Sequence, residues 1–346
     1  MAFIAVACCF NHAALAEEAT GYLIAAVSPI PDGGSGWDHV SIDSANRHVF
    51  VGRGPAGLAV LDADTGAYIL SVPETKGSHG AAIAPDLGLG FSDNGKGGDL
   101  TIFDLKTLKP TAHLQVGETT DGVFYDPVTR TGLVNNGETG HVTFFDPLQP
   151  RVLASLDLET KKPEFAVVDG RGAAFIDLQD RNAVARIDMR ARKVTATWPL
   201  VGCDAPSSIA YDAGFDRLFV GCRGAAPAMA VVDASSGRTV ATLPIGQGND
   251  WAGFEPDKSL VFLANGGSAT LTVIRQMDAD HYREEETVGT RPLARTGAID
   301  VKTDTIFLVA AHYSRGGPGP DGKPVPIRIQ PGTTEAILLR RNALAP

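Results

Sequence analysis

The sequence predicts an all-β fold, a seven-bladed β-propeller of four-stranded blades. One motif occurs seven times along the 346 residues: two short apolar strands joined by a turn, then a third apolar strand and an alternating fourth one. The turns that join the first and second strands are 41 to 45 residues apart, and no window carries sustained helical periodicity. Four strands per repeat at this period indicate a propeller blade rather than a helical solenoid. These turns begin at Asp43, Ala84, Asp126, Val168, Asp212, Glu255 and Asp300.

A second motif, an apolar strand that ends in Asp before a turn, gives the third strand of most repeats. The sixth repeat has Arg275 at this place instead. An Asp side chain at such a turn accepts hydrogen bonds from the backbone amides that follow it. We therefore interpret these aspartates as structural residues. They are Asp62, Asp104, Asp146, Asp188 and Asp233.

The two ends of the chain complete the predicted ring. The last repeat contains only three predicted strands, and segment 22–27 is a strand with no blade of its own. Pairing this segment with the last blade closes the ring and covers an edge that would otherwise be open. The Gly- and Pro-rich segment 314–326 leaves the last blade and would be placed to act as a lid over one face.

The first residues have the pattern of a secretory signal peptide. Residues 1–16 combine a short apolar stretch with the small-residue site Ala14-Leu15-Ala16, and they are too short to span a bilayer. We expect residues 17–346 to form a single propeller domain, monomeric and exported to the periplasm or secreted. A buried N-terminal strand is the alternative for the same residues. No other stretch is long and apolar enough for a membrane helix, so no membrane insertion is expected.

The charge and the cysteines restrict the function further. The formal net charge is −10 and the isoelectric point is near 5.3, which argues against a nucleic-acid partner because no basic stripe is visible. Without the signal segment two cysteines remain, Cys203 and Cys222, and such a pair in an oxidising compartment suggests one disulfide. The sequence has no Cys-x-x-Cys-His haem site, no Gly-x-Ser-x-Gly motif and no phosphate-binding glycine loop. No cofactor is predicted, although a divalent metal ion remains open.

The repeats resemble those of a known family. The phrases Asp-Pro…Leu-Phe-Val and Val-Val-Asp-x-x-x-Gly, the latter at residues 231–237, look like the YVTN-type repeats of the YncE-like exported bacterial β-propellers. Segment 329–339 resembles their last blade, and the likeness covers essentially the whole mature chain. The literal Tyr-Val-Thr-Asn signature is absent. The resemblance implies the propeller fold and export, but it brings no shared catalytic motif.

Propeller geometry predicts which side chains gather at one mouth of the channel. Residues just before each first strand and just after each second strand lie on the same face of the disc, and convergent polar groups with aromatic walls are typical of ligand sites. The principal candidates are Trp37, Asp38, His39, His79, Asp121, Glu164, Asn249, Asp250, Trp251, Arg291, Arg295 and His312. Equivalent positions add Arg53, Ser78, Asn94, Thr120, Asn136, Asp204, Ser207, Arg223 and Asn265.

Each candidate also has a purely structural interpretation. Polar residues at a channel mouth are often only solvated, and tryptophans can pack under loops. Arg291 and Arg295 could clamp an anionic group, or they could pair with Asp250 and Glu164 without any ligand.

Three functions fit these residues, and the fold alone does not choose among them. The expected one is a non-catalytic binding or scaffold protein that holds a small polar or anionic ligand, or a partner's peptide, at the channel mouth. The second is a hydrolase of the lactonase type, and the third is a disc that binds only proteins. The hydrolase would use a metal held by Asp121, Glu164, Asn249 and Asp250, or the groups of His39, His79 and Arg295. A metal site made of His39, His79 and a carboxylate is a further possibility.

Overall fold

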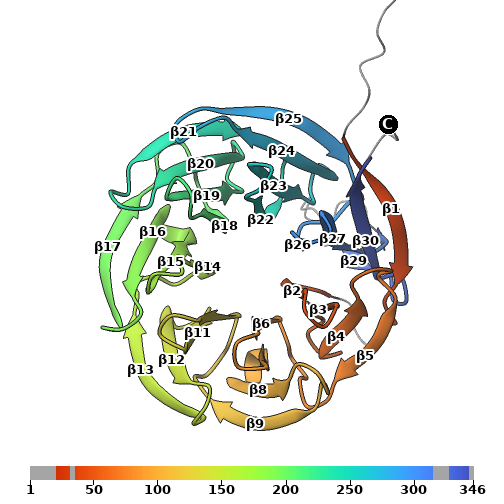
Figure 1. Ribbon diagram of the computed structural model, residues 1–346, viewed down its shortest axis with the longest axis vertical. Coiled ribbons are helices and arrows are strands. Elements are labelled where there is room, and N and C mark those ends of the chain that lie inside the picture. The colour runs from red at the N-terminus through yellow and green to blue at the C-terminus, as the bar shows by residue number, and fades with distance from the viewer. Residues whose placement is uncertain (1–20, 32–35, 315–326, 343–346) are drawn as a thin grey trace, which may run out of the picture.

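The structure is a computed structural model, and it describes residues 21–31, 36–314 and 327–342. Seven four-stranded sheets form a ring around a central channel (Figure 1), which confirms the predicted seven-bladed β-propeller. Within these ranges the only helices are two 3₁₀ turns, η1 (Gly95–Gly97) and η2 (Gln179–Arg181), so no described helix could cross a membrane. The predicted signal segment 1–16 and most of the predicted lid segment 314–326 lie outside the described residues.

Each of the first six blades uses four consecutive antiparallel strands, with the first strand innermost (Figure 1). Blades one to three contain β2 (Val40–Asp43), β3 (His48–Gly52), β4 (Leu58–Asp62), β5 (Tyr68–Val72), β6 (Gly80–Ala84), β7 (Leu89–Asp93), β8 (Asp99–Asp104), β9 (Pro110–Gln115), β10 (Gly122–Asp126), β11 (Thr131–Asn136), β12 (His141–Asp146) and β13 (Arg151–Asp157). Blades four to six contain β14 (Pro163–Val168), β15 (Ala173–Leu178), β16 (Ala183–Asp188), β17 (Lys193–Pro199), β18 (Pro206–Asp212), β19 (Arg217–Cys222), β20 (Ala228–Asp233), β21 (Thr239–Pro244), β22 (Asn249–Glu255), β23 (Leu260–Asn265), β24 (Thr270–Gln276) and β25 (Tyr282–Gly289).

The seventh blade closes the ring with strands from both ends of the chain. Its order from the rim is β1 (Tyr22–Pro29), β30 (Glu335–Arg341), β27 (Thr305–Ala310) and β26 (Gly297–Asp300). β1 runs antiparallel to β30 over its whole length, which confirms the predicted closure. A short hairpin of β28 (Tyr313–Ser314) and β29 (Arg328–Ile329), which the sequence did not predict, sits beside this blade.

Contacts beyond the β1–β30 ladder also hold the closure together. The Tyr22 ring packs edge-on against Phe262 of blade six, with ring centroids 5.2 Å apart, and its hydroxyl donates to Asp304 at 2.5 Å. Between blades one and seven, the buried Asp300 carboxylate accepts a hydrogen bond from Ser44 Oγ at 2.7 Å and pairs with Arg47. The last blade is therefore fastened to both of its neighbours.

The repeated acidic residues hold turns, as predicted. Asp43 Oδ1 accepts hydrogen bonds from the amides of Ala45 and Asn46 at 3.0 and 3.1 Å. The third-strand aspartates do the same, since each accepts from the amides two and three residues further on. These third-strand residues are Asp62, Asp104, Asp146, Asp188 and Asp233.

The apolar core lies between neighbouring blades. Phe219 of blade five, for example, packs with Val261 and Leu263 of blade six. Six of the seven second strands bury a Phe at their centre, and burial of one such side chain stabilises the fold by about 1.5–3 kcal/mol. These residues are Phe50, Phe91, Phe175, Phe219, Phe262 and Phe307.

Cys203 and Cys222 form the predicted disulfide, with their Cα atoms 5.4 Å apart. The bond joins the loop before β18 to the end of β19, so it fastens the entrance of blade five. A cross-link over a loop of this length contributes about 3 kcal/mol to stability.

Candidate functional site

One mouth of the channel carries a ring of polar side chains to which every blade contributes one member. We call this set the charged ring. Four of its members are carboxylates, two are arginines and one is a histidine. In blade order the charged ring consists of Asp38, His79, Asp121, Glu164, Arg223, Asp250 and Arg295.

The first three members of the charged ring form one cluster. His79 Nδ1 lies 2.8 Å from Asp38 Oδ2 and 3.3 Å from Asp121 Oδ1. The hydrogen bond to Asp38, together with the charges of nearby carboxylates, outweighs burial and raises the pKa of His79 to about 9. About a third of each side chain is exposed, so the cluster is reachable from solvent.

A fully buried carboxylate lies behind this cluster. Asp93 Oδ1 accepts a hydrogen bond from the amide of Gly80, the residue after His79, at 2.8 Å. Its other oxygen, Oδ2, has no hydrogen-bond partner among the described residues. Burial raises the pKa of Asp93 to about 6, although the charges of His79 and His39 act against this rise.

The other four members form a network of ion pairs. Arg223 Nη1 donates to Asp250 Oδ1 at 2.5 Å, and Arg295 Nε donates to Asp250 Oδ2 at 2.8 Å. Arg223 Nη2 also lies 3.6 Å from Glu164 Oε1, and the Arg295 guanidinium covers the Trp37 ring at 5.7 Å. Both arginines of the ring are thus already bound to carboxylates.

Two carboxylates of the charged ring, Glu164 and Asp250, lie at β-bulges. The pairing of β14 with β15 shifts between Pro163 and Ala166, which frees Glu164 and Phe165 from the regular register. The pairing of β22 with β23 shifts in the same way between Asn249 and Trp251, around Asp250. Bulges redirect side chains at functional sites in many sheets.

Several predicted site residues lie away from the charged ring. Asn249 is fully buried between blades, where it accepts from Ser208 Oγ at 2.7 Å and donates to two backbone carbonyls. The predicted metal set that includes Asn249 is therefore not formed. Arg291 pairs with Glu335 at 2.8 Å and lines, with His312, a separate cavity of about 230 Å³ beside blade seven.

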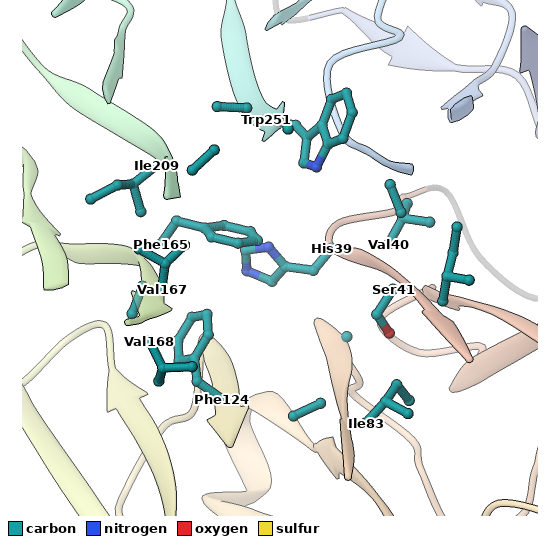
Figure 2. Close-up of a pocket in the computed structure, with 18 of the residues that line it drawn as sticks. His39, Val40, Ser41, Ile83, Phe124, Phe165, Val167, Val168, Ile209 and Trp251 are labelled. Atoms are coloured by element: carbon teal, nitrogen blue, oxygen red, sulfur yellow. The ribbon is translucent and has the colours of Figure 1, made fainter. Parts of the chain in front are cut away.

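The channel below the charged ring is apolar, which the sequence reasoning missed. It is a cavity of about 500 Å³ lined by the innermost strands of all seven blades. His39 of blade one and Phe165 of blade four meet across it, with ring centroids 4.7 Å apart, and Phe124 packs on Phe165 (Figure 2). His39 Nε2 lies 2.9 Å from the Asp121 carbonyl oxygen, so its ring stands between the polar mouth and the apolar channel. Trp251 forms another part of the wall (Figure 2).

Another fully buried carboxyl group, Asp177 of β15, was also missed by the sequence reasoning. Neither of its oxygens has a hydrogen-bond partner within the described part of the chain. Burial raises the pKa of Asp177 well above its usual value, and the nearby charge of Glu164 adds to this rise. The signal was present in the sequence, because Asp177 interrupts the apolar strand Ala-Ala-Phe-Ile-Asp-Leu. The equivalent residues of the other blades are Gly52, Asp93, Asn135, Gly221, Ala264 and Val309.

Comparison with solved structures supports the propeller fold, whereas comparison of the sequence finds no match. No family model matches the chain, and no curated protein matches it. Among solved structures, the hydrazine synthase of Kuenenia stuttgartiensis aligns over 81% of this chain and 94% of its own, with a TM-score of 0.69 and 13% identity. The WD40 repeats of RRP9 align over 92% and 100%, with a TM-score of 0.74 and 10% identity. U3-55K aligns over 92% and 99%, with a TM-score of 0.73 and 9% identity. The chain is a seven-bladed β-propeller, and at these identities the likeness to the three structures shows the fold alone.

Glu164 should make the stability of the protein depend on pH. Burial raises the pKa of Glu164 to about 7, against the opposing charge of Arg223. A carboxyl whose pKa is higher in the folded state favours folding below pH 4.5, and this contribution is lost as the pH rises through 7. Glu164→Gln should therefore gain stability relative to the wild type as the pH rises, by about 1–3 kcal/mol at pH 8. Urea unfolding between pH 4.5 and 8 measures this, with the exposed Glu118→Gln as control. A difference between Glu164→Gln and wild type that does not change with pH would contradict it.

Proposed function

We propose that this chain is an exported, YncE-like β-propeller of the YVTN type that binds a ligand at the channel mouth without catalysis. The repeat motifs support the family, and the pattern of residues 1–16 supports export. The charged ring carries the functional part of the proposal, because one polar side chain from each blade converges on one mouth. The ring lies above an apolar channel closed by aromatic residues.

The charges of the ring favour a ligand with a cationic group. Arg223 and Arg295 both bind Asp250, so an anionic ligand would have to displace a carboxylate before it could use them. On the other side, Asp38 and Asp121 both contact His79, the charge of His39 also acts on both, and Asp93 is buried nearby. This side of the mouth has an excess of negative groups, which a cation would neutralise.

A thermal-shift screen of the mature chain, followed by calorimetry, tests ligand binding. The panel consists of amines, basic amino acids, sugar acids and lactones, so that cationic and anionic compounds are tested under the same conditions. We expect a cationic compound to raise the melting temperature and to lose its effect in Asp121→Asn. The exposed Asp278→Asn, on the outer surface, is the control. A panel without any ligand would overturn this proposal and favour a disc that binds only proteins.

A metal-assisted hydrolase of the lactonase type is the second candidate. The observation in its favour is a carboxyl group in the charged ring, Glu164, with a pKa of about 7, which suits a general base at neutral pH. Lactone hydrolysis that requires a divalent metal and disappears in Glu164→Gln would support this candidate. Absence of turnover with and without added metal would exclude it.

A further inference from the structure

We propose that Asp38, His79 and Asp121 form a binding site for one divalent transition-metal ion. The inference rests on the proposed function in one respect, because it names the cation that the channel mouth takes. One donor atom from each side chain lies within 4.8 Å of the other two. In tetrahedral coordination at about 2.1 Å, two ligand atoms of one Zn²⁺ ion lie about 3.4 Å apart. His79 Nδ1 is already 2.8 and 3.3 Å from the two carboxylate oxygens, so the widest gap in the set, at most 4.8 Å, has to close by up to about 1.4 Å.

The donors come from three blades, and the scaffold holds each loop in place. The amide next to His79 is fixed by Asp93, and the loop that carries Asp121 is fixed by the bond between its carbonyl oxygen and His39 Nε2. Bonds of this kind orient the ligands of metal sites. Rigid loops at the ends of neighbouring blades bring the three donors together without any change in the sheets.

A second, independent observation points to a cation at the same place. Asp93 is fully buried, its Oδ2 atom has no partner in the described ranges, and its charge acts on both His79 and His39. Three carboxylates thus act on the half-buried His79, two of them by direct contact. The charge of Arg295 lowers the pKa of Asp38, but its guanidinium is already bound to Asp250. A divalent ion would displace the proton of His79 and balance the two carboxylates that this side chain contacts.

The donor set indicates the kind of metal. One imidazole with two carboxylates suits Zn²⁺ or Mn²⁺, whereas Ca²⁺ and Mg²⁺ prefer sites made of oxygen atoms alone. Three protein ligands leave at least one coordination position for water or for a ligand. The partial exposure of all three side chains keeps that position open to solvent.

Isothermal titration of the untagged, chelator-treated mature chain with ZnCl₂, MnCl₂, CaCl₂ and MgCl₂ tests the site. We expect about one Zn²⁺ or Mn²⁺ per chain with a micromolar or lower Kd, and no comparable binding of Ca²⁺ or Mg²⁺. His79→Ala and Asp121→Asn should each weaken binding at least tenfold. The matched control is His113→Ala, because His113 also pairs with a carboxylate, Glu74 at 2.7 Å, but lies on the outer surface. The Co²⁺ absorption spectrum of each variant reports the ligand set directly, and near-ultraviolet circular dichroism checks that each variant is folded.

Two results would overturn the inference: no saturable Zn²⁺ or Mn²⁺ binding by the wild type, or equal binding by a folded His79→Ala. In that case His79 would serve only as the cationic partner of two carboxylates. Failure of the metal site and failure of the proposed function are distinguishable. An organic cation that binds the chelator-treated protein would support the proposed ligand binding even if no metal binds. Metal binding without any response to the compound panel would support the metal site and contradict the proposed ligand binding.

Discussion

A chain that begins at residue 31, and so lacks β1, should self-associate and should lose about 5 kcal/mol or more of stability, because it loses several ladder hydrogen bonds at about 1 kcal/mol each. Most β1 side chains are exposed, so the loss comes mainly from the backbone ladder between β1 and β30. Tyr22 adds to it, since its ring is buried against Phe262 and its hydroxyl bonds Asp304. Removal of β1 exposes the whole edge of β30, and an open edge pairs readily with another chain.

Thermal unfolding and light scattering after gel filtration measure these two effects. The control is a chain that begins at Gly21, which keeps every residue of β1. We expect the control to melt like the mature chain and to remain monomeric, and the shorter chain to melt at least 10 °C lower or to elute as oligomers. A monomeric shorter chain with an unchanged melting temperature would show that β1 does not close the ring in solution.

Replacement of Asp177 by Val should stabilise the protein, by about 1–3 kcal/mol. The Asp177 carboxyl is fully buried and finds no hydrogen-bond partner among the residues described. Burial of such a group costs about that much relative to an apolar side chain. Blade seven shows that the position accepts the substitution, because Val309 occupies the equivalent place in β27.

Asp93→Val is the matched control for this prediction. Asp93 occupies the equivalent position of blade two, but its Oδ1 accepts the Gly80 amide, so its replacement leaves a buried donor unpaired and should destabilise the protein. Urea unfolding of both variants at pH 7 gives the comparison. Destabilisation by Asp177→Val would show that its carboxyl has a bonded partner in solution.

The architecture could be predicted from the sequence because it is repeated. Seven turns at nearly constant spacing determine the number of blades, and the extra strand 22–27 has only one open edge to pair with. The disulfide followed from the cysteine count, and the turn aspartates from their position before turn residues. Each of these inferences depends on local sequence or on counting, and none required the conformation of a loop.

The site could be predicted only in part, because its details depend on features that do not repeat. Positions next to the inner strands pointed to the mouth, and Asp38, His79, Asp121, Glu164, Asp250 and Arg295 do lie there. Their pairing depends on loop conformation. A bulge decides that Asp250 faces the mouth while its neighbour Asn249 turns between the blades, and no residue type marks such a bulge in advance.

The pairing of β1 with β30 sets the order of events when the protein is made. β1 is synthesised before the strands of the other six blades but can pair only when β30 is available, since all of those blades lie between β1 and β30 in the sequence. Six blades can form as the chain grows, because each uses consecutive strands. The seventh can form only after β30 has been synthesised. A contact of such long range is slow to form, so completion of blade seven should be the last step of folding.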